Sequence, residues 1–206
     1  MSAPLVAVLD YGIGNLRSAQ KALQKVGADA RLTNDASLIR EAAATVLPGV
    51  GNFGACMKAL DASGLTDLVR EQIAAGGPFL GICVGMQMLF DSSDESPEVP
   101  GLGIIHGRVR YLPSTVKRPQ MQWNRLSVRA SDAAMSGLPA EPWMYFVHSL
   151  HCVPDDPSRV IATADYGCSI TAAVRQDNVV AVQFHPEKSA VDGLAFLRTF
   201  VESAGG

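Results

Sequence analysis

Apolar residues follow two alternating patterns in the first half of the chain. Continuous apolar runs such as residues 5–9 predict buried strands. Apolar residues that recur every three or four positions, as at positions 16, 19, 23 and 26, predict helices. Asn15 stands at the cap position of the first helix, and Gly27 ends it. The pattern predicts strands at 5–9, 28–32, 45–47 and 78–82, and helices at 16–26, 35–43, 65–73 and 84–90. This alternation is typical of a parallel sheet with helices on its faces.

The second half has a different pattern, in which strands follow one another. Strands are predicted at 104–112, 122–128, 144–148, 170–174 and 179–184, with residues 176–178 as the turn of a hairpin between the last two. A final helix carries apolar residues at 194, 197 and 201, and Ser189 with Asp192 resembles a capping box at its start. Residues 92–100 are predicted to form a mobile surface loop. We expect a single α/β domain over residues 1–206, with a mixed, mostly parallel sheet flanked by helices.

Composition and charge exclude several classes of protein. The formal net charge is −3, which argues against a general nucleic-acid binder or a polybasic membrane binder. No apolar stretch approaches the roughly 18–20 residues of a membrane span, and the amino-terminal residues lack the features of a signal peptide. The four cysteines show no spacing typical of a zinc site, so we expect no metal. These features favour the reducing cytoplasm, with free thiols.

The segment Gly81-Ile82-Cys83-Val84-Gly85 stands between a predicted strand and a predicted helix. A glycine-flanked residue in this context occupies a sharp turn that exposes its side chain above the edge of the sheet. The start of the following helix favours a thiolate and offers backbone N–H groups to an oxyanion. An isolated cysteine is more often a buried apolar residue. The two glycines and the strand-turn-helix context favour a nucleophile at Cys83.

A second candidate follows the predicted strand at 179–184. His185 lies at the carboxyl end of that strand, where active sites of open α/β sheets gather, and Pro186 ends the strand. Glu187 is close enough in sequence to fold back onto the imidazole and fix its tautomer. A nucleophilic Cys83 needs a base, and His185 with its carboxylate neighbour is the best-placed group. The order Cys, His, Glu is typical of acyl transfer.

The segments GICVGMQ (81–87) and QFHPEKS (183–189) together resemble the class I, triad-type glutamine amidotransferases. The segments DYGIGNL (10–16), PGVGNFG (48–54) and YFVHS (145–149) resemble one branch of that family, the glutaminase subunits of imidazole glycerol phosphate synthase in histidine biosynthesis. The resemblance extends over essentially the whole chain. It implies a flavodoxin-like fold and one glutamine amidotransferase domain.

The resemblance also implies a reaction. Cys83 would attack the side-chain amide of L-glutamine, His185 would activate the thiol and protonate the departing ammonia, and Glu187 would orient His185. Water would release L-glutamate from the thioester. The ammonia would pass to a (β/α)8-barrel cyclase subunit in a heterodimer and yield imidazole glycerol phosphate and aminoimidazole carboxamide ribotide (AICAR). No cofactor is implied, and the docked, liganded cyclase is expected to activate the glutaminase.

Further residues of the expected site lie around this triad. The oxyanion donors are expected at Val84, Val50 and Gly51, and Gln87 lies one helical turn after Cys83 on the same face. By resemblance, the substrate-binding residues are Gly49, Gln87, His148, Ser149 and Leu150, and the partner interface contains Asn15, Arg17, Trp123, Tyr145 and Lys188. Leu150 departs from the aromatic residue that is frequent there.

Gln122 stands where the family pattern has a glycine. A glutamine there would be strained if the backbone requires positive φ, and otherwise it would change the docking surface. Elsewhere, Gly12 and Gly14 do not form a dinucleotide fingerprint, because position 17 is an arginine.

Other functions stay open at this point. The chain could serve another synthase of the anthranilate type, although residues 48–54 and 145–149 favour the first assignment. It could be a free-standing cysteine peptidase or γ-glutamyl hydrolase, but Gln87 suits an amino-acid head group that a peptidase does not need to bind. A redox sensor built on Cys83 would have no need of a proton acceptor supported by Glu187.

Overall fold

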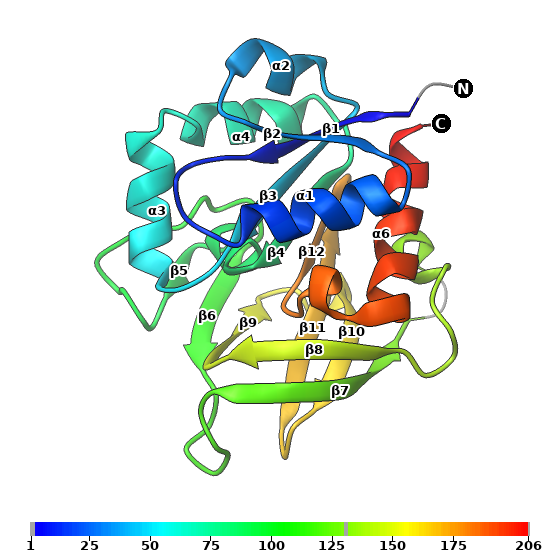
Figure 1. Cartoon of the computed structure of the whole chain (residues 1–206). Coiled ribbons are helices and arrows are strands. Elements are labelled where there is room, and N and C mark those ends of the chain that lie inside the picture. Colours follow the sequence, from blue (N-terminus) through cyan, green and yellow to red (C-terminus); the bar gives the residue numbers. More distant parts are fainter. Residues whose placement is uncertain (1–2, 130–131, 206) are drawn as a thin grey trace.

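Strands and helices alternate through the first half of the chain, as the hydrophobic pattern predicts (Figure 1). The computed structural model describes residues 3–129 and 132–205. The strands are β1 (Leu5–Leu9), β2 (Asp29–Thr33), β3 (Ala44–Gly49), β4 (Phe79–Cys83), β5 (Ser92–Ser93), β6 (Gly107–Tyr111), β7 (Gln120–Val128), β8 (Trp143–His148), β9 (Leu150–Pro154), β10 (Val160–Asp165), β11 (Ser169–Gln176) and β12 (Val179–Val182). The helices are α1 (Leu16–Lys25), α2 (Ala36–Glu41), α3 (Phe53–Ala62), α4 (Thr66–Ala74), α5 (Val84–Met88) and α6 (Ala190–Ala204), with short 3₁₀ turns η1 (Ala133–Met135), η2 (Pro157–Arg159) and η3 (Pro186–Lys188).

Nine strands form one mixed sheet in the order β2-β1-β3-β4-β12-β11-β10-β7-β8. The first five are parallel to one another, and the remaining four continue the sheet in antiparallel pairs. A smaller sheet has the order β5-β6-β9. The fold is therefore the expected mixed α/β arrangement, in which β4 and β12 lie side by side near the middle of the large sheet. Cys83 and the segment after β12 are thus brought to the same edge.

The parallel strands are apolar because helices cover them. All five residues of β4 and all four of β12 are buried, and α1 packs against α6 beside the sheet (Figure 1). One continuous hydrophobic core joins the residues of both halves of the chain. The antiparallel strands β7 and β8 lie at the end of the large sheet (Figure 1). Met144 and Phe146 of β8 are buried in the core, whereas much of β7 is exposed to solvent. This combination gives a rigid sheet edge for chemistry and an exposed ribbon beside it.

Several local predictions need correction. Helix α3 and strands β9 and β10 were not expected, and the strand predicted at 104–112 begins only at Gly107. Helix α3 begins after Asn52, whose side chain accepts the N–H of Ala55 and so supplies a cap. The apolar residues Ile104 and Ile105 pack against the core without joining the ladder. These residues are apolar because the irregular segment is buried, and the resulting apolar run resembles that of a strand.

One cap prediction and one loop prediction are wrong, and a second cap prediction is correct in position but not in the hydrogen bond that a cap makes. Asn15 occupies the cap position of α1, but its side chain accepts a bond from the Ser18 hydroxyl and caps no backbone group. Ser189 and Asp192 form no capping box, since their side chains accept the N–H groups of Tyr145 and Trp143 instead. The segment 92–100 is not simply a surface loop, because it contributes β5 and the buried side chains of Ser93 and Ser96.

Candidate active site

Cys83 lies on a sharp turn between β4 and α5. Its backbone has φ 56° and ψ −111°, a conformation that residues other than glycine rarely adopt. The glycines on either side are required by packing. A Cβ atom on Gly85 would overlap the carbonyl of Leu47, and one on Gly81 would lie 3.0 Å from Leu89 Cδ1 and 3.1 Å from Gly85 O. The predicted nucleophile elbow is therefore present, with Val84 as the first residue of α5.

His185 follows β12, and its backbone is fixed on both sides. Its N–H donates to the carbonyl of Tyr145 at 3.0 Å, and its carbonyl accepts from the Ser189 hydroxyl at 2.6 Å. Pro186 opens the 3₁₀ turn η3 and brings Glu187 back toward the ring. Nδ1 of His185 lies 2.8 Å from Oε1 of Glu187, and both side chains are buried. The carboxylate therefore holds the proton on Nδ1 and leaves Nε2 to face the thiol.

The charges around His185 favour its protonated form. Burial opposes that form, but Cys83 and Glu187 outweigh burial and raise the pKa of His185 to about 9. Nε2 is buried and has no hydrogen-bond partner in the described part of the chain, so it is free to exchange a proton with a substrate. An imidazolium next to a cysteine stabilises the thiolate, which is the reactive nucleophile.

A cavity of about 430 Å³ opens over Cys83 and His185. Its walls contain most of the predicted substrate and oxyanion residues, together with two interface candidates. These are Val50, Gly51, Val84, Gln87, His148, Ser149, Leu150, Asn15 and Lys188. Gly49 and Glu187 line a second, much smaller cavity, which Val50 and His185 also line. Trp123, Tyr145 and Arg17 lie outside the cavity. A separate cavity of about 170 Å³ near Pro78 and Asn178 contains neither a thiol nor an imidazole.

Gln87 is connected to the nucleophile through a residue that the sequence analysis did not select. The Gln87 amide donates to Oε1 of Gln183 at 3.0 Å, and Nε2 of Gln183 lies 3.7 Å from Sγ of Cys83. Gln183 is completely buried. Its place two residues before His185 was the available signal, but a glutamine in a strand has no distinctive pattern.

His148 supports the turn between β8 and β9. Its ring is buried, and Nδ1 lies 2.6 Å from the carbonyl of Leu150, so this nitrogen must donate. Burial is the main reason that the pKa of His148 is lowered to about 4, which keeps the ring neutral. Nε2 of the same ring lies 2.9 Å from Oε1 of Gln120. The ring thus braces the backbone of Ser149 and Leu150 along the cavity wall.

Glu95 lines the cavity and is another residue that sequence reasoning missed. Its Oε2 accepts the backbone N–H of Phe53 at 2.7 Å, and its side chain lines the cavity. It lies in the segment 92–100, for which a mobile loop was expected. An acidic residue in a predicted loop is usually solvated, so only the fold reveals its position.

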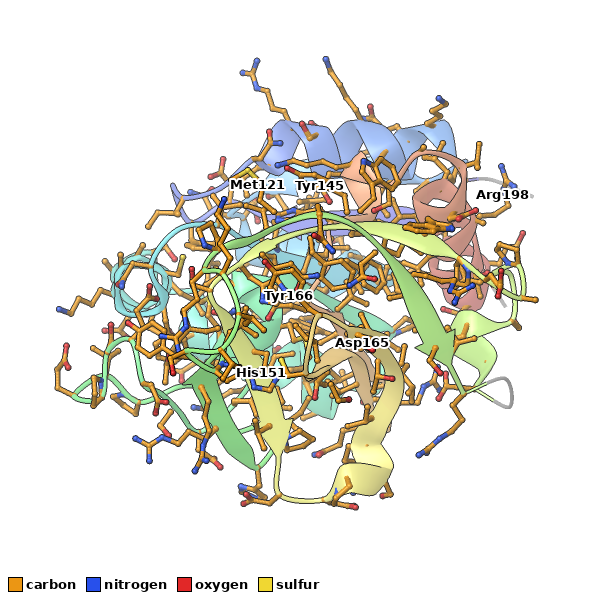
Figure 2. The ribbon with its side chains drawn as sticks, turned by 90° about the horizontal axis from the view of Figure 1, so that it is seen from below. Met121, Tyr145, His151, Asp165, Tyr166 and Arg198 are labelled. Atoms are coloured by element: carbon orange, nitrogen blue, oxygen red, sulfur yellow. The ribbon has the colours of Figure 1, made fainter. Side chains whose placement is uncertain are left out.

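The interface candidates surround an exposed face of β7 and β8. The rings of Trp123 and Tyr145 make an edge-to-face contact with centroids 6.1 Å apart, and Trp123 is 43% exposed. Met121 is 61% exposed and lies near Tyr145 on the same ribbon (Figure 2). Gln122 is exposed and has no positive φ, so the strain considered for it is absent and its side chain alters only the surface.

The described residues contain neither a cluster of His, Cys, Asp or Glu that could bind a metal ion nor a helix long and apolar enough to cross a membrane. All four cysteines are free. The reactive side chains gathered at the site are the thiol of Cys83, the imidazole of His185 and the carboxylate of Glu187.

A family model for "Glutamine amidotransferase class-I" matches residues 7–203. Three curated relatives bear the name "Imidazole glycerol phosphate synthase subunit HisH". The protein from Syntrophotalea carbinolica is 45% identical, with 95% of this chain and 98% of the relative covered, and that from Methanothermobacter thermautotrophicus is 47% identical, with 96% and 98% covered. The protein from Aquifex aeolicus is 46% identical, with 96% of each chain covered.

Solved structures agree in fold. A crystal structure of a glutamine amidotransferase superposes with a TM-score of 0.77 at 25% identity and covers 98% of this chain and 99% of that one. The structure of PurLQS from Thermotoga maritima superposes with a TM-score of 0.75 at 18% identity, covering 98% of this chain and 97% of that one. The chain belongs to the class I glutamine amidotransferase family, within the branch of imidazole glycerol phosphate synthase HisH proteins.

Proposed function

We propose that this chain is the glutaminase subunit of an imidazole glycerol phosphate synthase, that it hydrolyses L-glutamine at Cys83, and that it delivers the ammonia to a (β/α)8-barrel cyclase. The observation that carries the proposal is the buried array of Cys83, His185 and Glu187 at the carboxyl ends of β4 and β12. The family and the HisH relatives support the same function. The cavity of about 430 Å³ has room for one glutamine.

The first half-reaction forms a thioester. The thiolate of Cys83 attacks the amide carbon of glutamine, and the carbonyl oxygen becomes an oxyanion that backbone N–H groups at Val84 and Val50 or Gly51 stabilise. The imidazolium of His185 gives its Nε2 proton to the amide nitrogen, and the C–N bond breaks to release ammonia. The carboxylate of Glu187 keeps the ring in the orientation that allows this transfer.

The second half-reaction regenerates the free Cys83. The neutral His185 removes a proton from water, and the hydroxide attacks the γ-glutamyl thioester. The C–S bond then breaks, L-glutamate leaves, and Cys83 and His185 return to the thiolate–imidazolium pair. The same imidazole therefore serves as the acid in the first half-reaction and as the base in the second.

The cavity offers complementary groups to the amino-acid end of glutamine. Glu95 supplies a carboxylate for the α-ammonium group, and the amide of Gln87 is a further hydrogen-bonding group beside Cys83. The backbone of Ser149 and Leu150, braced by His148, is suited to the α-carboxylate. Recognition of both the α-ammonium and the α-carboxylate group distinguishes glutamine from an ordinary amide.

The cyclase is proposed to dock on the exposed face of β7 and β8, near Asn15, Arg17 and Lys188. The exposed Trp123 and the half-buried Tyr145 have the character of interface anchors. Tyr145 also accepts the N–H of His185 through its carbonyl, so the docking face and the catalytic histidine share a hydrogen bond. Docking at Tyr145 thus acts directly on the segment that holds His185.

The test is glutamate formation from glutamine by the purified chain, alone and with its cognate cyclase carrying the ribulosyl ligand. We expect slow hydrolysis alone and a large increase with the liganded cyclase. An equal rate in both cases would point to a free-standing hydrolase. The variant Cys83→Ala is the control and is expected to abolish hydrolysis in both.

A further inference from the structure

The segment Pro48–Gly51, which runs from the last two residues of β3 into the turn before α3, carries the part of the cavity wall that lies beside Val84. A Cβ atom on Gly49 would lie 2.6 Å from the backbone nitrogen of Gly85 and 3.0 Å from the carbonyl carbon of Val84. This segment therefore lies directly against the first turn of α5. Its backbone position relative to Cys83 must be held to a fraction of an ångström if it is to stabilise an oxyanion.

The first support behind this segment is the side chain of Tyr11. Tyr11 follows the end of β1 and is buried, and its hydroxyl donates to the carbonyl of Pro48 at 2.6 Å. The same hydroxyl lies 3.9 Å from the sulfur of Met88, the last residue of α5. Tyr11 thus links the loop to the helix that begins at Val84.

The second support is the thiol of Cys56 in α3. Sγ of Cys56 donates to the carbonyl of Val50 at 3.3 Å, and the residue has no exposed surface. Tyr11 and Cys56 also contact each other, and their interaction adds to burial in raising the pKa of the Tyr11 phenol. The two side chains form one buried polar pair behind the loop, and neither lines the cavity over Cys83.

The two hydrogen bonds hold alternate peptide groups. The carbonyl of Pro48 belongs to the Pro48–Gly49 peptide, and that of Val50 to the Val50–Gly51 peptide. Because each peptide is planar, fixing the two carbonyls fixes both neighbours of the Gly49–Val50 peptide, which carries the N–H of Val50. That N–H is restricted to the orientations that the two anchored flanks allow.

We infer that Tyr11 and Cys56 are positioning residues for glutamine hydrolysis, which hold the N–H of Val50 in place to stabilise the oxyanion formed at Cys83. The inference rests on the proposed function. The buried phenol of Tyr11 and the buried thiol of Cys56 would thus contribute to catalysis although neither touches the substrate. Their contribution appears in the transition state, because the charge on the substrate oxygen develops only there.

The test compares Cys56→Ala, Cys56→Ser and Tyr11→Phe with the wild-type chain, each in complex with the liganded cyclase. Cys56→Ala and Tyr11→Phe are expected to lower kcat about tenfold or more, with KM for glutamine little changed, since a misplaced oxyanion donor acts on the transition state. Cys56→Ser retains a donor for the Val50 carbonyl and is expected to recover most of the rate. Cys152→Ala is the matched control, because Cys152 is equally buried but its thiol makes no hydrogen bond among the described residues.

Alkylation separates positioning from a general collapse of the site. Iodoacetamide reacts with Cys83 by displacement of iodide and forms no oxyanion, so the rate of alkylation at Cys83, mapped by mass spectrometry, is expected to be unchanged in Cys56→Ala. The inference is overturned if kcat is unchanged or raised in Cys56→Ala, if Cys56→Ser is as impaired as Cys56→Ala, or if alkylation of Cys83 falls as much as kcat. Absence of glutamine hydrolysis by the wild-type complex would instead contradict the proposed function. If Tyr11→Phe does not fold, the two Cys56 variants alone decide the matter.

Discussion

Acidification is expected to unfold this chain in part through a single buried ring, that of His148. The pKa of His148 is lowered to about 4 in the folded chain, against 6.5 for an ordinary histidine. Between these two values the unfolded chain binds a proton that the folded chain does not, so stability falls as the pH drops from 6.5 toward 4. One pKa unit corresponds to about 1.4 kcal/mol, so the loss between pH 7 and pH 4.5 is about 2 to 3 kcal/mol.

The variant His148→Asn removes this titration while its amide can still donate to the carbonyl of Leu150. We expect the variant to be less stable at pH 7 but to lose about 2 to 3 kcal/mol less than the wild type on going to pH 4.5. Urea unfolding followed by far-UV circular dichroism at both pH values measures the difference. The pKa of His151 is also lowered by burial, but that contribution is common to both proteins and cancels in the comparison.

The control is His106→Asn, because the His106 side chain is 79% exposed. It is expected to lose stability in parallel with the wild type. Parallel losses in the wild type and His148→Asn would refute the conclusion that burial keeps His148 neutral.

Three further outcomes follow from the site. The pKa of His185 is raised to about 9, so the folding stability that this shift provides is present below pH 6.5 and is lost as the pH rises to about 9. Glu187→Gln removes one cause of the shift, so urea unfolding at pH 6.5 and 9 should show a smaller loss of stability in the variant than in the wild type. An equal loss in the two proteins would contradict the pairing of His185 with Glu187. Gly85→Ala should destabilise the fold by roughly 1–3 kcal/mol, because the new Cβ would overlap the Leu47 carbonyl. In the control Gly77→Ala the new Cβ would lie 3.8 Å from its nearest neighbour, so the free energy of unfolding should change by no more than about 0.5 kcal/mol in the same assay. Glu95→Gln should raise KM for glutamine more than it lowers kcat, and steady-state kinetics of the cyclase complex that give an unchanged KM would remove Glu95 from substrate binding.

The central part of the fold could be predicted because each signal there is local. A short apolar run marks a buried strand, and the glycines beside Cys83 mark a tight strand-to-helix turn. His185 and Glu187 are two residues apart, so a single turn brings them together regardless of the rest of the fold. A nucleophilic cysteine needs a base, which connected Cys83 with His185, and the family resemblance supported that connection. The adjacency of β4 and β12 explains it physically.

One kind of wrong prediction concerns side chains with more than one available partner, and another concerns buried residues that do not pair in a sheet. Ser189 and Asp192 have the spacing of a capping box, but the end of β8 offers them backbone N–H groups that the helix terminus does not outcompete. The apparent strand at Ile104 and Ile105 reflects burial without pairing. Tertiary structure decides which partner such a side chain binds, and a local sequence pattern carries no information about tertiary structure.

The functional residues that were missed have no local signal. Glu95 and Gln183 are a loop acid and a strand glutamine in the sequence, and only the fold brings them to the cavity and to Cys83. Tyr11 and Cys56 are separated from each other by more than forty residues and meet behind the Pro48–Gly51 segment. An ordinary polar residue becomes part of a site through long-range packing, so sequence spacing does not reveal it.

The most direct test of the account is the identification of the covalent intermediate. The wild-type chain, in complex with the liganded cyclase, is mixed with glutamine and quenched in acid during turnover, and its peptides are analysed by mass spectrometry. The account predicts a γ-glutamyl group on Cys83 that hydroxylamine removes and that is absent from Cys83→Ala. A glutamyl group on Cys56, Cys152 or Cys168, or glutamine hydrolysis that persists in Cys83→Ala, would contradict the account.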